Sequence, residues 1–155
     1  MKQDIELNDY TKELNNLEIW GVCAGFGSRF YLHIGKKIKR ETPVQNEYLS
    51  ELLTEYEGFY VIGVTCAWRL EKNNKVVLSH IQDEEVYITP TLEKLEGAKI
   101  LSINEISNNM GLNILMNNGI TLTLFYDNVK DYNWILFKNK EFYFGVKEFK
   151  YKNKE

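Results

Sequence analysis

The 155-residue sequence predicts a mainly β fold, α+β at its margin, with about nine antiparallel strands and two or three short helices. Aromatic residues make up 14% of the chain, and their rings suit a half-buried, pleated surface. Apolar and polar residues alternate along most of the chain, and turn residues divide it into successive hairpins. No strand–helix–strand rhythm interrupts them, so the hairpins are expected to form a sandwich or a partly open barrel.

Length and composition predict a single domain over residues 1–155. A chain of 155 residues with 44% hydrophobic and 26% charged residues is typical of one globular domain. Residues 1–16 are expected to form a helical, polar N-terminal arm, and residues 150–155 a frayed tail. The arm carries apolar residues at near-helical spacing behind a good N-cap, Asn8: Leu7, Tyr10, Leu14 and Leu17.

The first hairpin is predicted from strands at 17–24 and 29–39, joined by a tight turn of Gly25-Phe26-Gly27-Ser28. Alternation in the second strand places these apolar residues on one side: Phe30, Leu32, Ile34 and Ile38. The other side carries Tyr31, His33, Lys37 and Lys39. This second side is expected to face water.

The middle of the chain predicts a helix, a long strand and a second hairpin. An amphipathic helix is expected at 46–56, after Pro43 and ending at Gly58. Residues 59–70 predict one long strand, which turns at 72–75 into a strand at 76–81. The inward residues of the long strand are expected to be Tyr60, Ile62, Val64, Cys66, Trp68 and Leu70.

The last third of the chain predicts more strands after a short helical stretch. Asp83-Glu84-Glu85 is expected to be a solvated loop or edge, and Leu92 and Leu95 predict one or two helical turns that stop at Gly97. Asn117-Asn118-Gly119 is a strong hairpin signal. The remaining strands are predicted at 99–106, 112–116, 120–126, 134–137 and 142–149.

The net charge and the cysteine pattern predict the cellular location of the protein and the classes of partner it binds. The formal net charge is −3 and would be repelled by a nucleic-acid duplex, so no nucleic-acid partner is expected. The chain has no apolar run of the ~20 residues that a membrane span needs, and no membrane association is expected. Cys23 and Cys66 lie far apart without a CxxC pair or a signal peptide, which favours reduced thiols and a cytoplasmic location.

The sequence offers little material for catalysis. His33 and His80 are the two histidines, and neither lies at metal-ligand spacing from another ligand type. Ser28 lies in a glycine turn that lacks the Gly-x-Ser-x-Gly frame of a nucleophile elbow. Cys66 is expected among apolar groups, which keep a thiol protonated. We therefore predict no catalytic residue, no metal ligand and no cofactor.

Four residues are candidates for binding: Arg69, Trp20, Tyr31 and His33. Arg69 is one of three arginines in a chain with sixteen lysines. Arginine forms planar, bidentate pairs that lysine cannot form, so Arg69 is expected to have a fixed partner. That partner is either another protein or a glutamate of a neighbouring strand. Tyrosines on the expected water-facing sides are typical of protein interfaces.

Residues 17–71 resemble a loosely defined set of small bacterial proteins. In that set a Trp-Gly-Val…Gly-Ser hairpin, here Trp20-Gly21-Val22 and Gly27-Ser28, precedes a strand ending in Cys-x-Trp-Arg, here Cys66-Ala67-Trp68-Arg69. The resemblance carries no catalytic residues. It implies a small accessory protein, and some proteins of this kind resemble immunity partners of secreted toxins.

The leading hypothesis is a non-enzymatic binding protein, an immunity-type inhibitor that occludes the active site of a bacterial toxin. The alternative is a small-molecule-binding β-barrel or a hydrolase with an internal pocket. A third possibility is a structural subunit that self-associates through an exposed strand edge. The sequence leaves the oligomeric state and the identity of the partner open.

Overall fold

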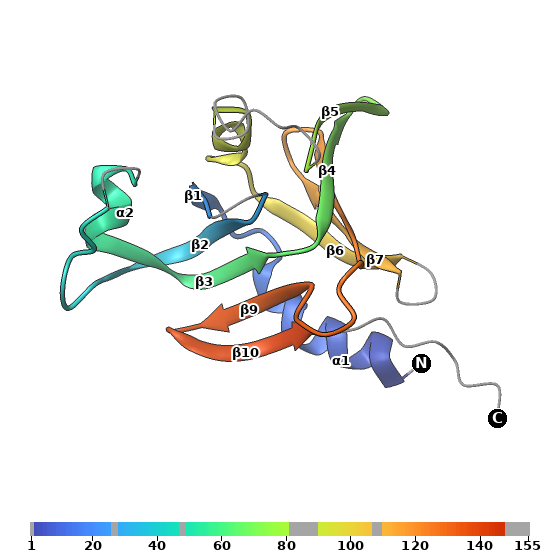
Figure 1. The fold of residues 1–155 in the computed structure, drawn as a ribbon, viewed down its shortest axis with the longest axis horizontal. Coiled ribbons are helices and arrows are strands. Elements are labelled where there is room, and N and C mark those ends of the chain that lie inside the picture. The colour runs from blue at the N-terminus through green and yellow to red at the C-terminus, as the bar shows by residue number, and fades with distance from the viewer. Residues whose placement is uncertain (1, 26–27, 47–48, 81–89, 107–109, 148–155) are drawn as a thin grey trace.

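The computed structural model describes residues 2–25, 28–46, 49–80, 90–106 and 110–147, and within them it is mainly β (Figure 1). Ten strands form two five-stranded antiparallel sheets. The first sheet contains, in spatial order, β1 (Ile19–Ala24), β2 (Phe30–Lys39), β3 (Tyr56–Val64), β9 (Trp134–Lys138) and β10 (Glu141–Val146). The second contains β5 (Lys75–Ser79), β4 (Ala67–Lys72), β8 (Ile120–Phe125), β7 (Gly111–Met116) and β6 (Ile100–Ile106).

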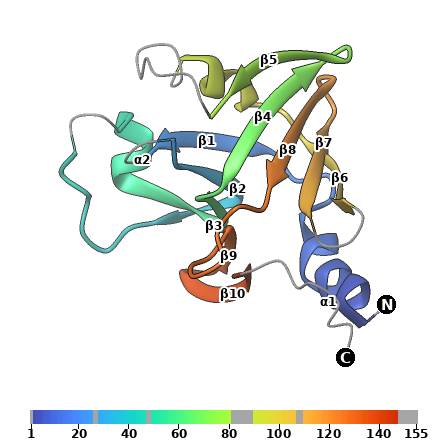
Figure 2. The ribbon, with the colours of Figure 1, turned by 45° about the vertical axis from the view of Figure 1, so that its right-hand side comes forward.

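The helical segments are short. They are α1 (Lys2–Thr11), the 3₁₀ turn η1 (Lys12–Leu14), α2 (Glu51–Glu55) and the 3₁₀ turn η2 (Glu93–Leu95). The N-terminal arm is helical, but the prediction that Asn8 caps its helix is wrong, because α1 begins at Lys2 and Asn8 lies inside it. Helix α1 lies beside β10, where Tyr10 stacks on Phe144 at 4.6 Å between ring centroids (Figure 2). No helix in the described ranges has the length and apolar character needed to cross a membrane.

The two sheets pack as a sandwich and do not close into a barrel, with strands that run in different directions in the two layers (Figure 1). Alternate residues of each strand point between the layers and form one apolar cluster. Its largest members, Trp68, Trp134 and Phe30, are fully buried. The predicted fold class is therefore confirmed as a sandwich.

The prediction of one long strand over residues 59–70 is wrong. The chain leaves the first sheet after Val64, turns a corner at Thr65 and Cys66, and enters the second sheet at Ala67. Both corner amides donate to the carbonyl oxygen of Asn133, at 3.0 and 3.2 Å. All six predicted inward residues are nevertheless buried. Alternation is continuous through the corner, so it indicates the inward side without showing that the strand changes sheet. The described residues therefore contain ten strands instead of about nine.

The predicted helix at 46–56 is also too long. Helix α2 begins after Ser50, whose hydroxyl accepts the Leu53 amide at 3.3 Å, and spans five residues. Tyr56 already pairs with Lys39 as the first residue of β3, so the helix ends before Gly58. The apolar spacing at 52, 53 and 56 therefore combines a short helix with the start of a strand.

The predicted turns at 72–75 and 117–119 are confirmed, as is the connection between the predicted strands at 134–137 and 142–149. Asn73, Asn74, Gly119, Asn139 and Lys140 all have positive φ angles, as tight hairpins require. Gly97, at φ 90°, ends the helical stretch before β6 as predicted. Residues 26–27, the loop at 83–85 and the tail at 150–155 lie outside the described residues.

Candidate binding face

The outward side of the first sheet carries a continuous uncharged surface. Strand register places ten side-chain positions on this side, paired across neighbouring strands: Gly21, Cys23, Tyr31, His33, Val61, Gly63, Ile135, Phe137, Phe142 and Gly145. Their neighbours along each strand, such as Val22, Leu32 and Leu136, belong to the core. We call these ten residues, together with Tyr132, the aromatic face.

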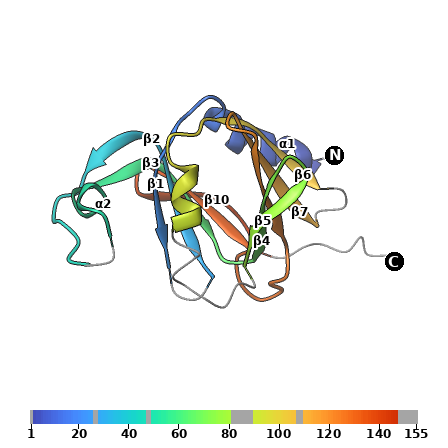
Figure 3. The same ribbon diagram turned by 90° about the horizontal axis from the view of Figure 1, so that it is seen from above.

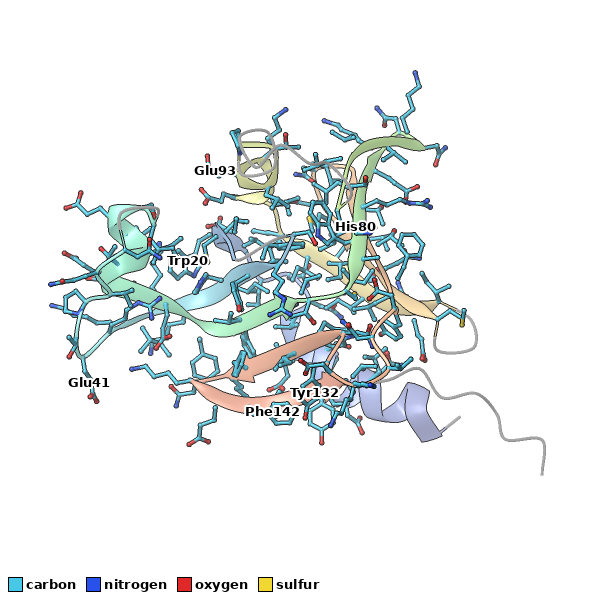
Figure 4. The ribbon with its side chains drawn as sticks, viewed as in Figure 1. Trp20, Glu41, His80, Glu93, Tyr132 and Phe142 are labelled. Carbon is cyan, nitrogen blue, oxygen red and sulfur yellow. The ribbon has the colours of Figure 1, made fainter. Side chains whose placement is uncertain are left out.

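Aromatic rings lie over glycines on this face. A Cβ atom on Gly63 would lie 3.1 Å from the ring of Tyr31, and one on Gly145 would lie 2.9 Å from the ring of Tyr132. The ring of Tyr132, which precedes β9, lies 5.7 Å between centroids from the ring of Phe142 in β10 (Figure 4). The missing glycine side chains therefore let the rings lie close to the sheet.

Part of this face is open to solvent. Tyr31 is 36% exposed and Phe142 is 55% exposed, while Val61, Ile135 and Phe137 are partly exposed. Aromatic side chains without neighbouring charges are enriched at the centres of protein interfaces, because they bury a large apolar area at a low cost in conformational entropy. The aromatic face therefore has the chemistry of a protein-binding surface.

Trp20 and His33 lie at the end of the same face but are covered. The sequence places His33 on a water-facing side, and this prediction is wrong, because His33 is only 5% exposed and Trp20 only 7%. Helix α2 folds back over this end, and Figure 4 shows Trp20 between α2 and β1. A Cβ on Gly21 would lie 2.8 Å from Leu53 Cδ2, so the leucine of α2 occupies the space above that glycine. Three of the four predicted binding residues, Trp20, Tyr31 and His33, are thus brought together on one face.

Cys23 and His33 form a contact that was not predicted from the sequence. The Sγ atom of Cys23 lies 3.7 Å from Nε2 of His33, and the amide of Gly58 donates to Nδ1 at 3.1 Å. Because Nδ1 accepts a hydrogen bond, the neutral ring carries its proton on Nε2, facing the thiol. The imidazole therefore cannot take the thiol proton, and this pair is not arranged as a nucleophile and its base. The predicted pairing of the strands at 17–24 and 29–39 was the sequence feature that could have indicated this contact.

Burial keeps both groups neutral. It raises the pKa of the Cys23 thiol to about 11 and lowers the pKa of His33 to about 4. The nearby guanidinium of Arg40 has a smaller effect on both groups: it opposes the rise at Cys23 and adds to the fall at His33. Among the residues that the structure describes, no three His, Cys, Asp or Glu side chains cluster as metal ligands would.

Arg69 lies apart from the other three candidates, on the outward side of the second sheet (Figure 3 shows the two sheets from above). Its guanidinium lies 4.9 Å from the ring centroid of Phe125, and its Nη2 atom lies 3.3 Å from Glu71 Oε1. The fixed partner expected for Arg69 is thus a glutamate of its own strand. Glu71 in turn lies 3.2 Å from the hydroxyl of Thr123, which also contacts Asn113 at 2.8 Å.

A second polar cluster was not foreseen from the sequence. The carboxylate of Glu13 in η1 accepts hydrogen bonds from Lys138 at 2.8 Å, Tyr60 at 3.2 Å and Tyr143 at 2.5 Å. The hydrogen bond from Lys138, followed by that from Tyr143, lowers the pKa of Glu13. These residues are distant in sequence, so no local pattern links them. The cluster attaches the N-terminal arm to the first sheet.

Comparison of the chain with protein-family models, curated proteins and solved structures gave no match.

Proposed function

We propose that this protein is a non-enzymatic binding protein that uses the aromatic face to bind a protein partner. The observation that carries the proposal is the outward side of the first sheet, where ten paired positions carry no charge and two of its rings, Tyr31 and Phe142, are open to solvent. A contiguous exposed apolar surface is typical of an interaction site. The tautomer of His33, which leaves Cys23 without a base, supports a binding role over a catalytic one.

The arrangement of the core favours a partner on the outside of the molecule over a ligand between the sheets. The side chains between the layers include Trp68, Trp134 and Phe30, all fully buried and in mutual contact with other apolar residues. A groove formed around α2 opens outward and is lined by Pro43, Val44, Gln45, Asn46, Thr54 and Glu55. These features support the binding hypothesis over an internal pocket.

Residues 96–98 cover the outer edge of β1. This cover disfavours self-association through that strand. The Ile19 amide donates to Ala98 O at 2.8 Å, and the Gly97 amide donates to Ile19 O at 2.7 Å. The Val22 amide donates to the carboxylate of Glu96 at 3.2 Å. A second strand could not pair with β1 without displacing this segment.

We propose further that the partner is a secreted bacterial toxin, which this protein inhibits in the cytoplasm by covering its active site. The likeness of residues 17–71 to immunity-type proteins supports this form of the proposal. Cys23 and Cys66 are both free thiols, as suits a reducing compartment. The net charge of −3 favours a protein over a nucleic acid as the partner.

The experiment compares capture of a partner by three forms of the tagged protein expressed in its native host. The wild type is compared with the double variant Tyr31→Ser/Phe142→Ser and with Val76→Ser. Val76 is 57% exposed on β5 of the other sheet, so it controls for loss of an exposed apolar group elsewhere. We expect one stoichiometric protein bound to the wild type and to Val76→Ser and lost from the double variant.

Two results would overturn the proposal. Equal capture by all three forms would place the interface elsewhere, and no stoichiometric partner under several growth conditions would oppose a binding role. The inhibitory role is tested by expressing the captured partner alone and with this protein. Growth should fail with the partner alone and recover with the wild type but not with Tyr31→Ser/Phe142→Ser.

A further inference from the structure

We infer that α2 is a removable cover and that the aromatic face continues beneath it, with Trp20 and His33 as further contacts for the same protein partner. This inference rests on the proposed function. Trp20 and His33 belong to β1 and β2 and adjoin Cys23 and Tyr31 on the open part of the face. The two rings lie 5.5 Å apart between centroids. Uncovering them would extend the aromatic surface toward the end of the sheet, where the ammonium group of Lys37 lies over the ring of Trp20.

A single side chain makes the buried contact of α2 with the sheet. Leu53 is 2% exposed and lies over Gly21, whereas the adjacent Leu52 is 42% exposed. The carbonyl of Leu53 also accepts a hydrogen bond from Nε of Arg40 at 3.0 Å. The Arg40 and Val44 amides donate to the carbonyls of Glu55 and Thr54 at 2.8 and 3.0 Å, so backbone hydrogen bonds hold the C-terminal end of α2. A helix of five residues has little stability of its own, so Leu53 is the side chain that holds the rest of it on the sheet.

The covered state leaves one polar group unsatisfied. The indole nitrogen of Trp20 is buried and has no hydrogen-bond partner among the described residues. A buried donor without an acceptor destabilises the state that buries it. Lifting α2 would let water or a carbonyl group of the partner accept this hydrogen bond.

The sheet beneath the cover is held independently of α2. His33 is fixed by the hydrogen bond from the amide of Gly58 in β3, and Lys37 lies 5.3 Å from the ring centroid of Trp20. Neither contact involves α2. The surface under the helix is therefore already shaped for binding when the helix leaves.

Quenching of tryptophan fluorescence by acrylamide tests the cover without any partner. Trp68 and Trp134 are fully buried, so a rise in quenching reports Trp20, and Trp20→Phe supplies the baseline. Leu53→Ala removes the buried contact and should raise the ratio of open to covered protein roughly tenfold or more. The matched control Leu52→Ala, on the exposed side of α2, should leave quenching as in the wild type.

A second variant tests the inference if Leu53→Ala does not fold. Gly21→Ala places a methyl group in the space of Leu53 Cδ2 and should also expose Trp20, while near-UV circular dichroism of Trp68 and Trp134 stays unchanged. Wild-type quenching in both variants would overturn the inference, even if the partner bound the open face. Increased quenching in Leu52→Ala alone would also overturn it.

Binding of the captured partner tests whether Trp20 and His33 contact it. If the partner contacts the covered residues, Leu53→Ala should bind it more tightly, because less of the protein is in the closed form. Trp20→Phe should weaken binding by roughly tenfold. Exposure of Trp20 with no change in partner affinity would overturn the assignment of Trp20 as a contact. Loss of the partner from every form would instead count against the proposed function.

Discussion

At the scale of single residues, one backbone hydrogen bond determines what His33 can do. The amide of Gly58 donates to Nδ1, which leaves the proton on Nε2 toward Cys23. Adding a second proton would place a charge in a buried site and remove the acceptor of that amide. Burial accordingly lowers the pKa of His33 to about 4. The imidazole is therefore neutral near pH 7.

This lowered pKa predicts a loss of stability in acid. The unfolded chain protonates His33 near pH 6.5, whereas the folded chain does so only near pH 4. More protons are bound to the unfolded state between these values, so stability falls as the pH falls through them, by up to about 3 kcal/mol. His33→Asn keeps an acceptor for Gly58 and removes the titration. In chemical denaturation, the wild type should lose about 3 kcal/mol more than His33→Asn between pH 7 and 4. Equal losses would show that His33 titrates normally.

Arg69 predicts a small effect on stability. Arg69 and Glu71 are 41% and 27% exposed, and pairs this accessible contribute about 0–1 kcal/mol. Arg69→Ala should therefore change the unfolding free energy by less than about 1 kcal/mol. Arg40→Ala is the comparison, since Arg40 and Glu57 are 19% and 20% exposed and Arg40 also donates to Leu53 O. Arg40→Ala should cost more in a thermal melt. A loss of about 3–5 kcal/mol for Arg69→Ala would mark it as a buried structural residue.

At the scale of secondary-structure elements, the N-terminal arm is held from both sides. Leu7 and Leu14 are buried against the core, and Glu13 accepts three hydrogen bonds from the first sheet. Tyr10 adds ring contacts with Tyr143 and Phe144. The arm therefore links β3, β9 and β10 of the first sheet to the core of the sandwich.

Glu13→Gln should loosen this arm. The substitution removes the charge that Lys138 and Tyr143 stabilise, and we expect a loss of about 1 kcal/mol near pH 7 because the cluster is partly exposed. The pKa of Glu13 is lowered in the folded state, so its stabilisation is present above the ordinary pKa of a glutamate and disappears as the pH falls through the lowered value. Hydrogen exchange of the α1 amides measures the effect. Asp9→Asn is the control, since Asp9 is 62% exposed and 4.0 Å from Lys12.

The sequence predicted elements well where the pattern was local. The Asn-Gly hairpin, the turn at Asn73 and Asn74 and the inward side of residues 60–70 followed from turn chemistry and alternation. The length of α2 did not, because the pairing of Tyr56 with Lys39 overrides the helical spacing. The burial of His33 did not either, since strand alternation does not indicate that a helix will fold back over the outward side.

At the scale of the whole molecule, the two sheets share one core. Leu122 lies at the centre of β8, pairs with Leu70 and Ile114 and is fully buried. Leu122→Ala should therefore lower the unfolding free energy by about 2–5 kcal/mol. Leu115→Ala is the control on the neighbouring strand, because Leu115 is 37% exposed on the outward side. An unchanged midpoint of denaturation for Leu122→Ala would show that the inward side of β8 is misassigned.

Only part of the aromatic face could be predicted from the sequence. Trp20, Tyr31 and His33 are close in sequence, and hairpin pairing brings them to one face. The contributions of β9 and β10, Ile135, Phe137 and Phe142, come from the other end of the chain, and sequence alternation does not specify which sheet a hairpin joins. The Glu13 cluster could not be predicted for the same reason, since it joins residue 13 to residues 60, 138 and 143.

The position of β9 beside β3 affects the order in which the protein can form during translation. Strand β3 ends at Val64 and its neighbour begins at Trp134, so about 70 residues, including the whole second sheet, are made between them. At about 5–20 residues per second, the ribosome needs roughly 4–15 s for this stretch. During that time the nascent β1–β2–β3 unit has an unpaired edge at β3, with Val61 and Ile62 beside it. Aggregation of the growing chain should therefore begin at this edge, and a nascent-chain chaperone that shields it would act between these two strands.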